Sequence, residues 1–590
     1  MENLTYDWNL QDIYDNEQDF FVDYEKYKNL IKEKIKKFKG KLNNKKDVLQ
    51  YFKLQTEELK LAAKIMSFVS LRQSLDGKDE FARKVEGDYA YFAQEVSPEI
   101  VLLEDQLFKI KNSKLLEWAE DSDFKDYDLI LKDIIEQKKH KQPSKVEAVL
   151  AKNSGFGISS EVFDKFDDVD LKFGFVNTKE GKVELTHATY GKLIEHKDQK
   201  VRKEAFDKMH DTFKNFNYTL GSLYLGSVNE HMFFVDINKY KNALEMDSAP
   251  NKISIKILPT LISVVNDNFD LFYRFENLKK KYLGLKKYYT FDNYVPIGKM
   301  NKKFDYNQGS GLVCDALKVM GDDYVNVVKK ALTEGWIDVY EKPAKTSGGF
   351  SLGVYGVHPY ILLNYSGTYE DVSTLAHELG HTMHSFLSDK TQVIDKSDYS
   401  IFVAEVASVV NEIILANFML DKCETKQEKI FCLNQILKQF YTTLYRQTMF
   451  TEFEHYVYTS KEKKQPLIVE NLNEFYKNLQ DKYFGADVIK TENAKYEWSR
   501  VPHFYRPYYV YKYATGFISA CIIAGNLLAN KPGYKEKYLK FLSAGSSVFP
   551  VELLKTVDVD LTKKGTLQGA FVLYKKYLDE FEELIKEENL

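Results

Sequence analysis

Long stretches of this sequence repeat apolar residues at the spacing of an α-helix. Apolar residues recur three and four positions apart, with polar residues between them, over residues 48–72, 89–108, 256–282 and 431–458. Proline and glycine, which interrupt helices, number only 12 and 29 among 590 residues. The sequence therefore predicts a mainly α-helical protein built from long packed helices.

Strand signals are few. Residues 171–176 and 183–187 flank a glycine-containing turn, and this pattern predicts a β-hairpin. Residues 287–292 and 360–365 are two further candidate strands. We therefore expect small sheets within a helical fold.

The length of the chain predicts more than one lobe. A chain of 590 residues is too long for one ordinary hydrophobic core. We place a soft boundary after the hairpin, which gives an N-terminal helical lobe, residues 1–190, and a larger domain, residues 191–590. No linker rich in proline, glycine or serine marks this boundary, so we expect the two lobes to pack together.

Composition and charge exclude several classes of partner. The net charge is -4, and no basic stripe indicates nucleic-acid binding. The longest apolar stretches, near residues 517–528, are too short and interrupted to span a bilayer. The N-terminus lacks a basic region followed by an apolar run, so we expect no signal peptide. The four cysteines are sparse, which favours thiols in a reducing compartment, and together these features predict a cytoplasmic protein.

A histidine motif lies on one of the predicted helices. His377 and His381 are four residues apart, so they share a helix face and can bind one metal ion. Thr368 can cap the start of this helix, with Asp371 completing a capping box. Glu378 lies beside the first histidine, where a carboxylate can act as general base on a water molecule. The motif predicts a zinc hydrolase, with a peptidase as the favoured kind.

A catalytic zinc ion needs a third protein ligand and a position for water. The next predicted helix, residues 399–420, carries Glu405 and Glu412 on one face among apolar side chains. Because a carboxylate in such surroundings needs a partner, we choose Glu405 as the third ligand. Glu412 is either an acceptor for a histidine N–H or part of a buried ion pair or an exposed helix end. His384, on the histidine face, is predicted to line the site rather than bind the metal, and manganese or cobalt would fit the same ligands as zinc.

Two other segments have properties that suit this chemistry. Residues 501–516 contain a dense run of tyrosines with one histidine, and such groups can donate hydrogen bonds to an oxyanion. An aromatic core stripe is the alternative interpretation. The glycine-rich residues 347–353 predict either a mobile loop over a cleft or a plain turn before residues 360–365. An extended peptide could pair with the edge of that last strand.

The motifs together resemble the thimet-oligopeptidase-like zinc metallopeptidases, and within them the bacterial oligoendopeptidase F group. The distance in sequence from His381 to Glu405 is also typical of that family and longer than in thermolysin-like enzymes. The resemblance covers nearly the whole chain. The segments that carry it are residues 8–14, 377–384, 402–408, 446–450, 498–516 and 544–547, followed by Pro550.

The resemblance implies a two-lobed helical metallopeptidase with a deep substrate channel, a small β-sheet near the active site and zinc on the channel floor. It implies short peptides as substrates and carries the metal ligands over to His377, His381 and Glu405, with Glu378 as base. The oxyanion-stabilising residues of the family correspond to His503, Tyr508 and Tyr511, and Tyr505 is the alternative to Tyr508. Val510 stands where many relatives have glycine.

We therefore expect a zinc metalloendopeptidase that hydrolyses internal bonds of short oligopeptides, with one Zn²⁺ per chain. Two alternatives are a zinc exopeptidase of the metallocarboxypeptidase kind and a peptide-binding protein without catalysis. The presence of Glu378 argues against the second, because a binding protein has no use for a base at that position. We expect short peptides as partners, no nucleic acid and no membrane, and the sequence predicts no oligomeric state.

Overall fold

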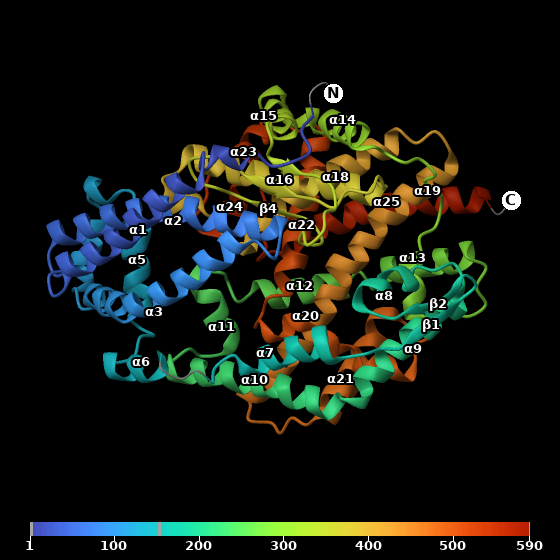
Figure 1. The fold of residues 1–590 in the computed structure, drawn as a ribbon. Helices are drawn as coiled ribbons and strands as arrows, with labels where there is room; N and C mark the ends of the chain where they lie inside the picture. Colours follow the sequence, from blue (N-terminus) through green and yellow to red (C-terminus); the bar gives the residue numbers. More distant parts are fainter. Residues whose placement is uncertain (1–3, 152–154, 589–590) are drawn as a thin grey trace. The chain divides into compact units, whose positions relative to one another are not determined.

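The structure, a computed structural model, describes residues 4–151 and 155–588. Helices make up most of these residues, and the strands found among them form one two-stranded and one three-stranded sheet (Figure 1). The prediction of a mainly α-helical fold with small sheets is therefore confirmed.

The chain divides into two compact units, and each unit is assembled from three separate segments. Unit 1 comprises Met1–Ser144, Lys302–Leu415 and Asn526–Asp558. Unit 2 comprises Lys145–Asn301, Ala416–Gly525 and Val559–Leu590. The predicted division at residue 190 assumes continuous lobes, and it stays a prediction about how the chain is organised.

Unit 1 begins with three long helices that run side by side (Figure 1). Their buried faces form a hydrophobic core with Trp8, Tyr360 and Leu362, which joins the N-terminal helices to a small sheet. The Trp8 indole Nε1 also donates a hydrogen bond to the carbonyl of Ile361 at 2.7 Å. The helices of unit 1 are α1 Glu17–Phe38, α2 Lys45–Leu75, α3 Glu80–Phe108, α4 Asn112–Ala119, α5 Asp128–Gln137, α14 Tyr306–Ala316, α15 Asp322–Thr333, α16 Tyr369–Thr391, α17 Ile394–Ser397, the first part of α18 Ile401–Asp421, α23 Tyr534–Leu542 and α24 Pro550–Thr556.

The three-stranded sheet of unit 1 has the order β3-β5-β4, with bounds Ile337–Asp338, Tyr360–Leu362 and Phe350–Leu352. The central strand β5 is parallel to β3 and antiparallel to β4. A strand is therefore present within the predicted residues 360–365, but both of its edges are paired. The expectation that a peptide pairs with the edge of this strand is wrong, because β4 is the outer strand beside α16.

Unit 2 is also mainly helical, and it contains the predicted hairpin. Strands β1 Phe175–Thr178 and β2 Gly181–Glu184 pair antiparallel around a two-residue turn. The first strand lies nearer the turn than the predicted residues 171–176, and both strands extend into the predicted turn. The second strand ends before the predicted residue 187 because Thr186 caps α8, where its hydroxyl accepts from the N–H of Thr189 at 3.1 Å. The helices of unit 2 are α7 Ile158–Lys165, α8 His187–Ile194, α9 Gln199–Asn215, α10 Asn217–Ile237, α11 Ala243–Ser248, α12 Ile257–Asn266, α13 Phe269–Tyr282, α19 Lys426–Gln439, α20 Arg446–Glu462, α21 Val469–Phe484 and α25 Lys564–Glu588, while α6 Ser144–Ala151, α18 and α22 Tyr511–Leu528 span unit boundaries.

Two local predictions are wrong for the same physical reason. The helix predicted over residues 256–282 is broken between α12 and α13, where the buried side chain of Asn268 donates to the carbonyl of Val264 at 2.8 Å. The strand predicted over residues 287–292 is mostly a 3₁₀-helix, in which Asp292 accepts from the N–H of Tyr289 at 2.9 Å. In both places a short polar side chain takes a backbone hydrogen bond that the regular element would have used.

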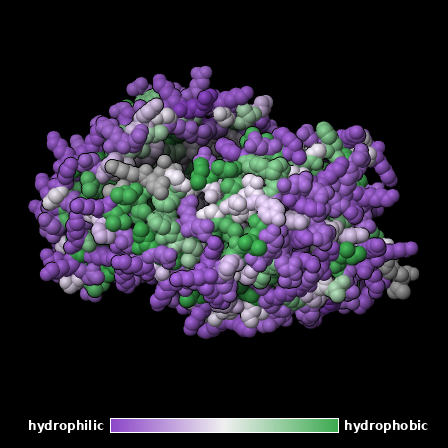
Figure 2. All heavy atoms as spheres, turned by 90° about the horizontal axis from the view of Figure 1, so that it is seen from below, coloured by the Kyte–Doolittle hydropathy of each residue, from purple (hydrophilic) through white to green (hydrophobic). Residues whose placement is uncertain are grey.

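The longest apolar helix is α18, not the region near residues 517–528. By length and composition alone α18 could cross a membrane, but 67% of its most apolar window is buried within the protein. A core helix of a folded protein has the same composition. Figure 2 shows one face of the molecule, which is mostly hydrophilic with smaller apolar areas between the charged side chains.

Candidate active site

The histidine motif lies on α16 of unit 1, and the start of this helix is capped as predicted. The Thr368 hydroxyl accepts from the N–H of Asp371 at 3.2 Å, and the Asp371 carboxylate accepts from the N–H of Thr368 at 2.8 Å. Two backbone N–H donors at this helix end are thereby satisfied. The buried face of the helix includes Val372, Leu379 and Met383, which fixes the rotation of α16 about its axis.

The two histidines of the motif point at the same place. Their Nε2 atoms, on His377 and His381, lie 3.2 Å apart, and both side chains are about one-fifth exposed, at 24% and 18%. This convergence follows from their spacing of four residues on one regular helix. The pair therefore presents two nitrogen ligands toward a single point that solvent can reach.

Helix α18 crosses α16 at very close range, and Gly380 makes this possible. A Cβ at Gly380 would lie only 2.6 Å from the carbonyl oxygen of Ala407 and the Cα of Ser408. The crossing is also tied by Asn411, whose Nδ2 donates to the carbonyl of Ala376 at 3.1 Å. The small residue in the motif thus lets carboxylates on α18 reach the histidines on α16.

Glu405 completes a group that could hold a metal ion. Its Oε2 lies 3.6 Å from Nε2 of His377 and 3.7 Å from Nε2 of His381. Ligands held about 2.0–2.1 Å from a tetrahedral zinc ion lie roughly 3.3–3.4 Å from one another. The observed separations therefore fit such a centre with small adjustments. The Ser408 hydroxyl donates to the same Oε2 at 3.0 Å and orients the carboxylate.

Glu412 lies behind the histidine pair and accepts a hydrogen bond from it. Its Oε1 is 2.8 Å from Nδ1 of His377, so the proton on Nδ1 leaves Nε2 available to a metal. Burial lowers the pKa of His377, but this hydrogen bond and the surrounding carboxylate charges raise it to about 9 in the metal-free chain. The alternative of an exposed helix end for Glu412 is excluded by this contact.

Glu378 has the burial and the raised pKa that suit a general base. Its side chain is 5% exposed, and its Oε2 has no hydrogen-bond partner among the described residues. Burial raises the pKa of Glu378 to about 7. A Cβ at Gly349, just before β4, would lie 3.4 Å from its Oε1, so the glycine keeps space open beside the carboxylate. The glycine-rich segment therefore adjoins the base directly.

His384 lies on the same helix but does not join the group. Its ring is fully buried and stacks on Tyr399 with a centroid separation of 3.6 Å. Burial lowers the pKa of His384 to about 3, so the ring is neutral. The ligand group found among the described residues contains His377, His381 and Glu405 without it. His384 thus packs in the core beneath the site.

The predicted oxyanion residues lie in unit 2. His503 is in a short 3₁₀ turn, and its Nε2 lies 3.4 Å from the Tyr513 hydroxyl. Tyr511 is the first residue of α22 and is 1% exposed. Tyr508 is fully buried, has a φ of 48°, and shares a hydrogen bond of 3.2 Å between its hydroxyl and Nδ1 of His455. Tyr505 packs in a hydrophobic cluster, with its ring 4.5 Å from that of Phe163.

Sequence reasoning missed Glu454 and His455, which both contact Tyr508. The N–H of Tyr508 donates to Oε1 of Glu454 at 2.7 Å. A usable signal was present, because Glu454 lies on α20 beside the apolar residues Phe450, Phe453 and Val457. This is the same argument that identified Glu405: a carboxylate on an apolar helix face needs a partner.

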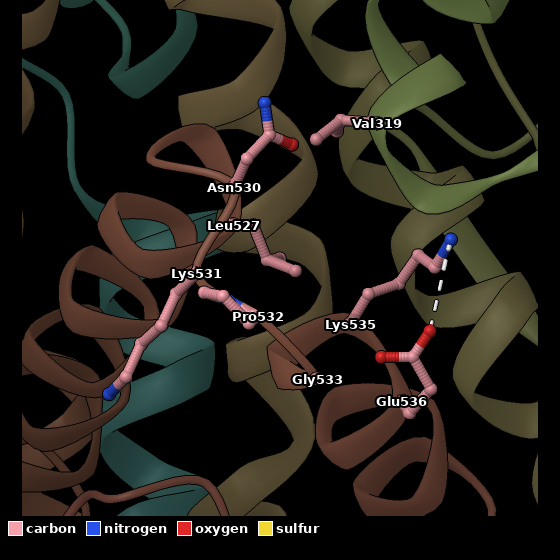
Figure 3. Close-up of a pocket in the computed structure, with 8 residues that line it drawn as sticks. All are labelled: Val319, Leu527, Asn530, Lys531, Pro532, Gly533, Lys535 and Glu536. Atoms are coloured by element: carbon pink, nitrogen blue, oxygen red, sulfur yellow. Dashed lines mark ion pairs between the residues drawn. The ribbon is translucent and has the colours of Figure 1, made fainter.

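A separate pocket in unit 1 lacks the features of this site. It has a volume of about 200 Å³ and lies around the turn between α22 and α23 (Figure 3). Its charged side chains belong to solvent-facing residues such as Lys535 and Glu536, which form a loose ion pair at 4.0 Å. We assign no catalytic role to it.

Comparison with known proteins agrees with the geometry in unit 1. The family model described as "Peptidase family M3" matches residues 192–573, and one described as "Oligopeptidase F" matches residues 106–173. The chain is 32% identical to oligopeptidase PepF of Bacillus subtilis, over 98% of this chain and 87% of the relative. A crystal structure from Chlamydophila abortus aligns with a TM-score of 0.87 and 29% identity over 98% of both chains. Oligoendopeptidase-F from Enterococcus faecium aligns with a TM-score of 0.75 and 28% identity, over 97% of this chain and 99% of that one.

The chain belongs to peptidase family M3. It is a metallopeptidase, and membership of the family implies a bound metal ion. The His-His-Glu group on α16 and α18 is a place in the described structure that could hold such an ion. In a member of this family, the buried carboxylate of Glu378, whose Oε2 has no partner among the described residues, can take part in peptide hydrolysis.

Proposed function

We propose that this family M3 peptidase uses zinc, held by His377, His381 and Glu405, to cleave internal bonds of short peptides, with Glu378 as general base. One observation carries the proposal. Three ligand atoms lie within 4.8 Å of one another beside a buried carboxylate that has no partner among the described residues. No purely structural role requires both features together.

The chain's own residues supply the proton chemistry. A bound zinc ion would polarise the peptide carbonyl and lower the pKa of water. Glu378 would take the proton of the attacking water and deliver it to the leaving amine nitrogen. Burial raises the pKa of Glu378 to about 7 in the metal-free chain, and a bound zinc ion would lower it, so the carboxylate would be available to accept the proton at neutral pH. Glu412 holds the Nδ1 proton of His377, which keeps Nε2 of that ring free for the metal.

The outer edge of β4 is our candidate for binding the substrate backbone. Among the described strands, β4 pairs only with β5, so its second edge has no strand neighbour. Strand β4 begins immediately after Gly349 in the chain, and the absence of a Cβ at this glycine leaves space beside Glu378. An extended peptide added to this edge would gain main-chain hydrogen bonds that do not depend on its sequence. Such binding suits an enzyme that acts on varied oligopeptides.

The family resemblance supplies candidates for the oxyanion donors. We propose that Tyr508, Tyr511 and His503 donate hydrogen bonds to the oxyanion that forms when water attacks the carbonyl. Burial raises the pKa of both tyrosine hydroxyls, so each keeps its proton and can act as a donor. Burial also lowers the pKa of His503, which favours a neutral ring with one N–H.

The test is cleavage of a quenched fluorescent peptide blocked at both ends. We expect internal cuts by the wild type, loss of activity with a chelator, and loss in Glu378→Gln with its metal content intact. Glu370→Gln is the matched control, because this residue is an exposed acid in the first turn of the same helix. Equal cleavage in all four samples would refute the proposal. Cleavage only of unblocked peptides would indicate an exopeptidase, and binding without turnover would indicate a peptide-binding protein.

The identity of the metal and the compartment need separate measurements. Metal analysis of protein purified without added metal should find one zinc ion per chain, and manganese or cobalt would replace zinc in the proposal if found instead. We retain the cytoplasm as the proposed compartment. Fractionation of the source cells tests it, with activity in the soluble interior fraction as the expected result.

A further inference from the structure

Tyr508 has a backbone conformation that tyrosine rarely adopts. Its φ is 48°, in the left-handed region, and the residue is completely buried. A bulky residue with positive φ is uncommon and persists only where its surroundings hold it. Contacts with its surroundings therefore hold Tyr508 in this conformation.

Helix α20 contacts Tyr508 at three points. Oε1 of Glu454 accepts the Tyr508 backbone N–H at 2.7 Å. Nδ1 of the next residue, His455, lies 3.2 Å from the Tyr508 hydroxyl. One turn along, the ring of Tyr458 stacks on that of Tyr508 at 5.2 Å. The backbone, the hydroxyl and the ring of one tyrosine are thus each contacted by the same helix.

Glu454 is an unexpected residue for this position. It is fully buried, its Oε2 has no partner among the described residues, and its neighbours on α20 are aromatic and aliphatic. Burial raises the pKa of Glu454 well above its usual range, which favours the protonated, neutral side chain. Burying a polar group that is only half satisfied is unfavourable, and a leucine or methionine would pack there at lower free-energy cost. We therefore assign a function to the Glu454 carboxyl, whose Oε1 accepts a hydrogen bond from the Tyr508 N–H.

The far end of the same segment is also fixed. Lys512, in the first turn of α22, places its Nζ 3.2 Å from Oδ1 of Asp247 on α11. Residues 508–511 therefore lie between two anchors, one at the Tyr508 N–H and one just after Tyr511. Loss of the first anchor would free the irregular backbone before α22 while the helix itself remained.

We infer that Glu454 is a positioning residue, whose carbonyl-type oxygen holds the Tyr508 backbone and so fixes the hydroxyls of Tyr508 and Tyr511 in the geometry needed for catalysis. This inference rests on the proposed role of the two tyrosines in stabilising the oxyanion. Glu454 itself contacts no reacting atom in this account. Its effect on the reaction is transmitted through the segment that it holds.

The decisive comparison is between Glu454→Gln and Glu454→Met. Both replacements are neutral and similar in length to the neutral acid, but only glutamine keeps an oxygen that can accept the Tyr508 N–H. We expect Glu454→Met to lower kcat by about tenfold or more, because small displacements of positioning groups have effects of that order. KM should change much less. Glu454→Gln should keep kcat within about threefold of wild type.

Glu452→Met is the matched control for loss of a carboxylate from α20. Glu452 accepts from the Tyr483 hydroxyl and from Lys482, both on α21, at 2.7 Å. These contacts do not involve residues 508–511. If Glu452→Met lowered kcat as much as Glu454→Met at equal thermal stability, a general effect on the helix would replace positioning as the explanation.

A spectroscopic measurement separates this inference from the proposed function. Fluorotyrosine placed at position 508 should give a ¹⁹F NMR signal that is unchanged in Glu454→Gln and shifted or broadened in Glu454→Met. A wild type that cleaves no peptide would defeat the proposed function, while the NMR result would still decide whether Glu454 holds Tyr508. The inference is overturned if folded Glu454→Met keeps the wild-type kcat and signal, or if Glu454→Gln is as impaired as Glu454→Met.

Discussion

Two regions are built in opposite ways. One is the candidate metal group of unit 1, His377, His381 and Glu405, and the other is the tyrosine segment of unit 2, residues 508–511. The metal group stands on two regular helices, so spacings of four residues in α16 and seven in α18 set the relative positions of the side chains. The tyrosine segment is irregular, includes a residue with positive φ, and depends on Glu454 more than fifty residues earlier in the chain. A regular helix transmits sequence spacing into geometry, whereas an irregular turn obtains its geometry from distant contacts.

The acids of the two regions also have different partners. Glu405 and Glu412 face imidazole rings, which can carry or bind positive charge, and each has a polar contact of 3.0 Å or less. Glu454 faces a backbone N–H and aromatic rings, so its neutral form is favoured. The same residue type therefore has imidazole partners in one unit and a backbone N–H partner in the other.

The largest expected effect is loss of the metal group. His381→Ala removes one of three ligands and should lower kcat/KM at least about a thousandfold, because the metal contributes several kcal/mol to transition-state stabilisation. Chelator treatment of the wild type should match it, and zinc should restore only the wild type. Peptide cleavage and metal content of the same preparations provide the measurements. Full activity in metal-free protein would remove the basis of the comparison between the two regions.

The tyrosine segment should have a smaller effect that leaves the metal in place. Tyr511→Phe removes one donor and should lower kcat by about a hundredfold to a thousandfold, as loss of a single oxyanion donor does. Tyr508→Phe should have a smaller effect, because the hydroxyl of Tyr508 already bonds to His455. Steady-state kinetics and metal analysis check this. If Tyr508→Phe exceeded Tyr511→Phe, the order of the two donors would be reversed.

Glu412 should tune how tightly the metal is held. Glu412→Ala removes the acceptor for the Nδ1 proton of His377 and, above about pH 9 where His377 Nε2 carries no competing proton in either protein, should weaken metal affinity about tenfold to a hundredfold. Competition with a chromophoric chelator measures this directly. Glu424→Ala, on an acid beyond the C-terminal end of the same helix, is the control and should leave the affinity unchanged. An unchanged affinity in Glu412→Ala would mean that the histidine orientation is fixed by packing alone.

The same contact predicts a pH dependence with a definite sign. The pKa of His377 is about 9 without metal, and metal binds only the form with a free Nε2. Above pH 9 Nε2 of His377 has no proton to lose when the metal binds. Below pH 9 the apparent metal affinity should fall by up to about tenfold per pH unit. Glu412→Ala removes the largest contributions that raise the pKa of His377, so the decline in affinity should begin at lower pH. Chelator competition from pH 6 to 10 tests both statements, and parallel profiles for the two proteins would contradict them.

This contrast explains which features could be predicted from the sequence. The capping box at Thr368, the histidine pair and the placement of Glu405 were accessible because each depends on residues of one helix or of two adjacent helices. The partner of Glu454 was not accessible, because nothing in the spacing from Glu454 to Tyr508 indicates contact. The break at Asn268 was missed because a side-chain hydrogen bond overrode an unbroken apolar periodicity.

The organisation into units was inaccessible for a related reason. Each unit combines three segments that are far apart in the sequence, and the helices α18 and α22 run through the boundaries without a break. Composition gives no signal where a regular helix continues from one unit to another. The strand order β3-β5-β4 was hidden in the same way, since the central strand is the last of the three in the chain.

The smallest expected effect concerns the helix crossing that supports the metal group. Gly380→Ala places a Cβ 2.6 Å from backbone atoms of α18, so the two helices must separate, and we expect a loss of about 1–3 kcal/mol in the free energy of unfolding. Gly87→Ala is the matched control, because Gly87 lies on the exposed face of α3 with nothing within 4 Å of its position for Cβ. There alanine should stabilise the protein by up to about 1 kcal/mol through its higher helix propensity. Denaturant unfolding of metal-free protein measures both variants, and opposite signs are the expected result. If both alanine variants were more stable than wild type, the crossing of α16 and α18 would accommodate a Cβ. The close approach of Glu405 to the histidines would then not depend on Gly380.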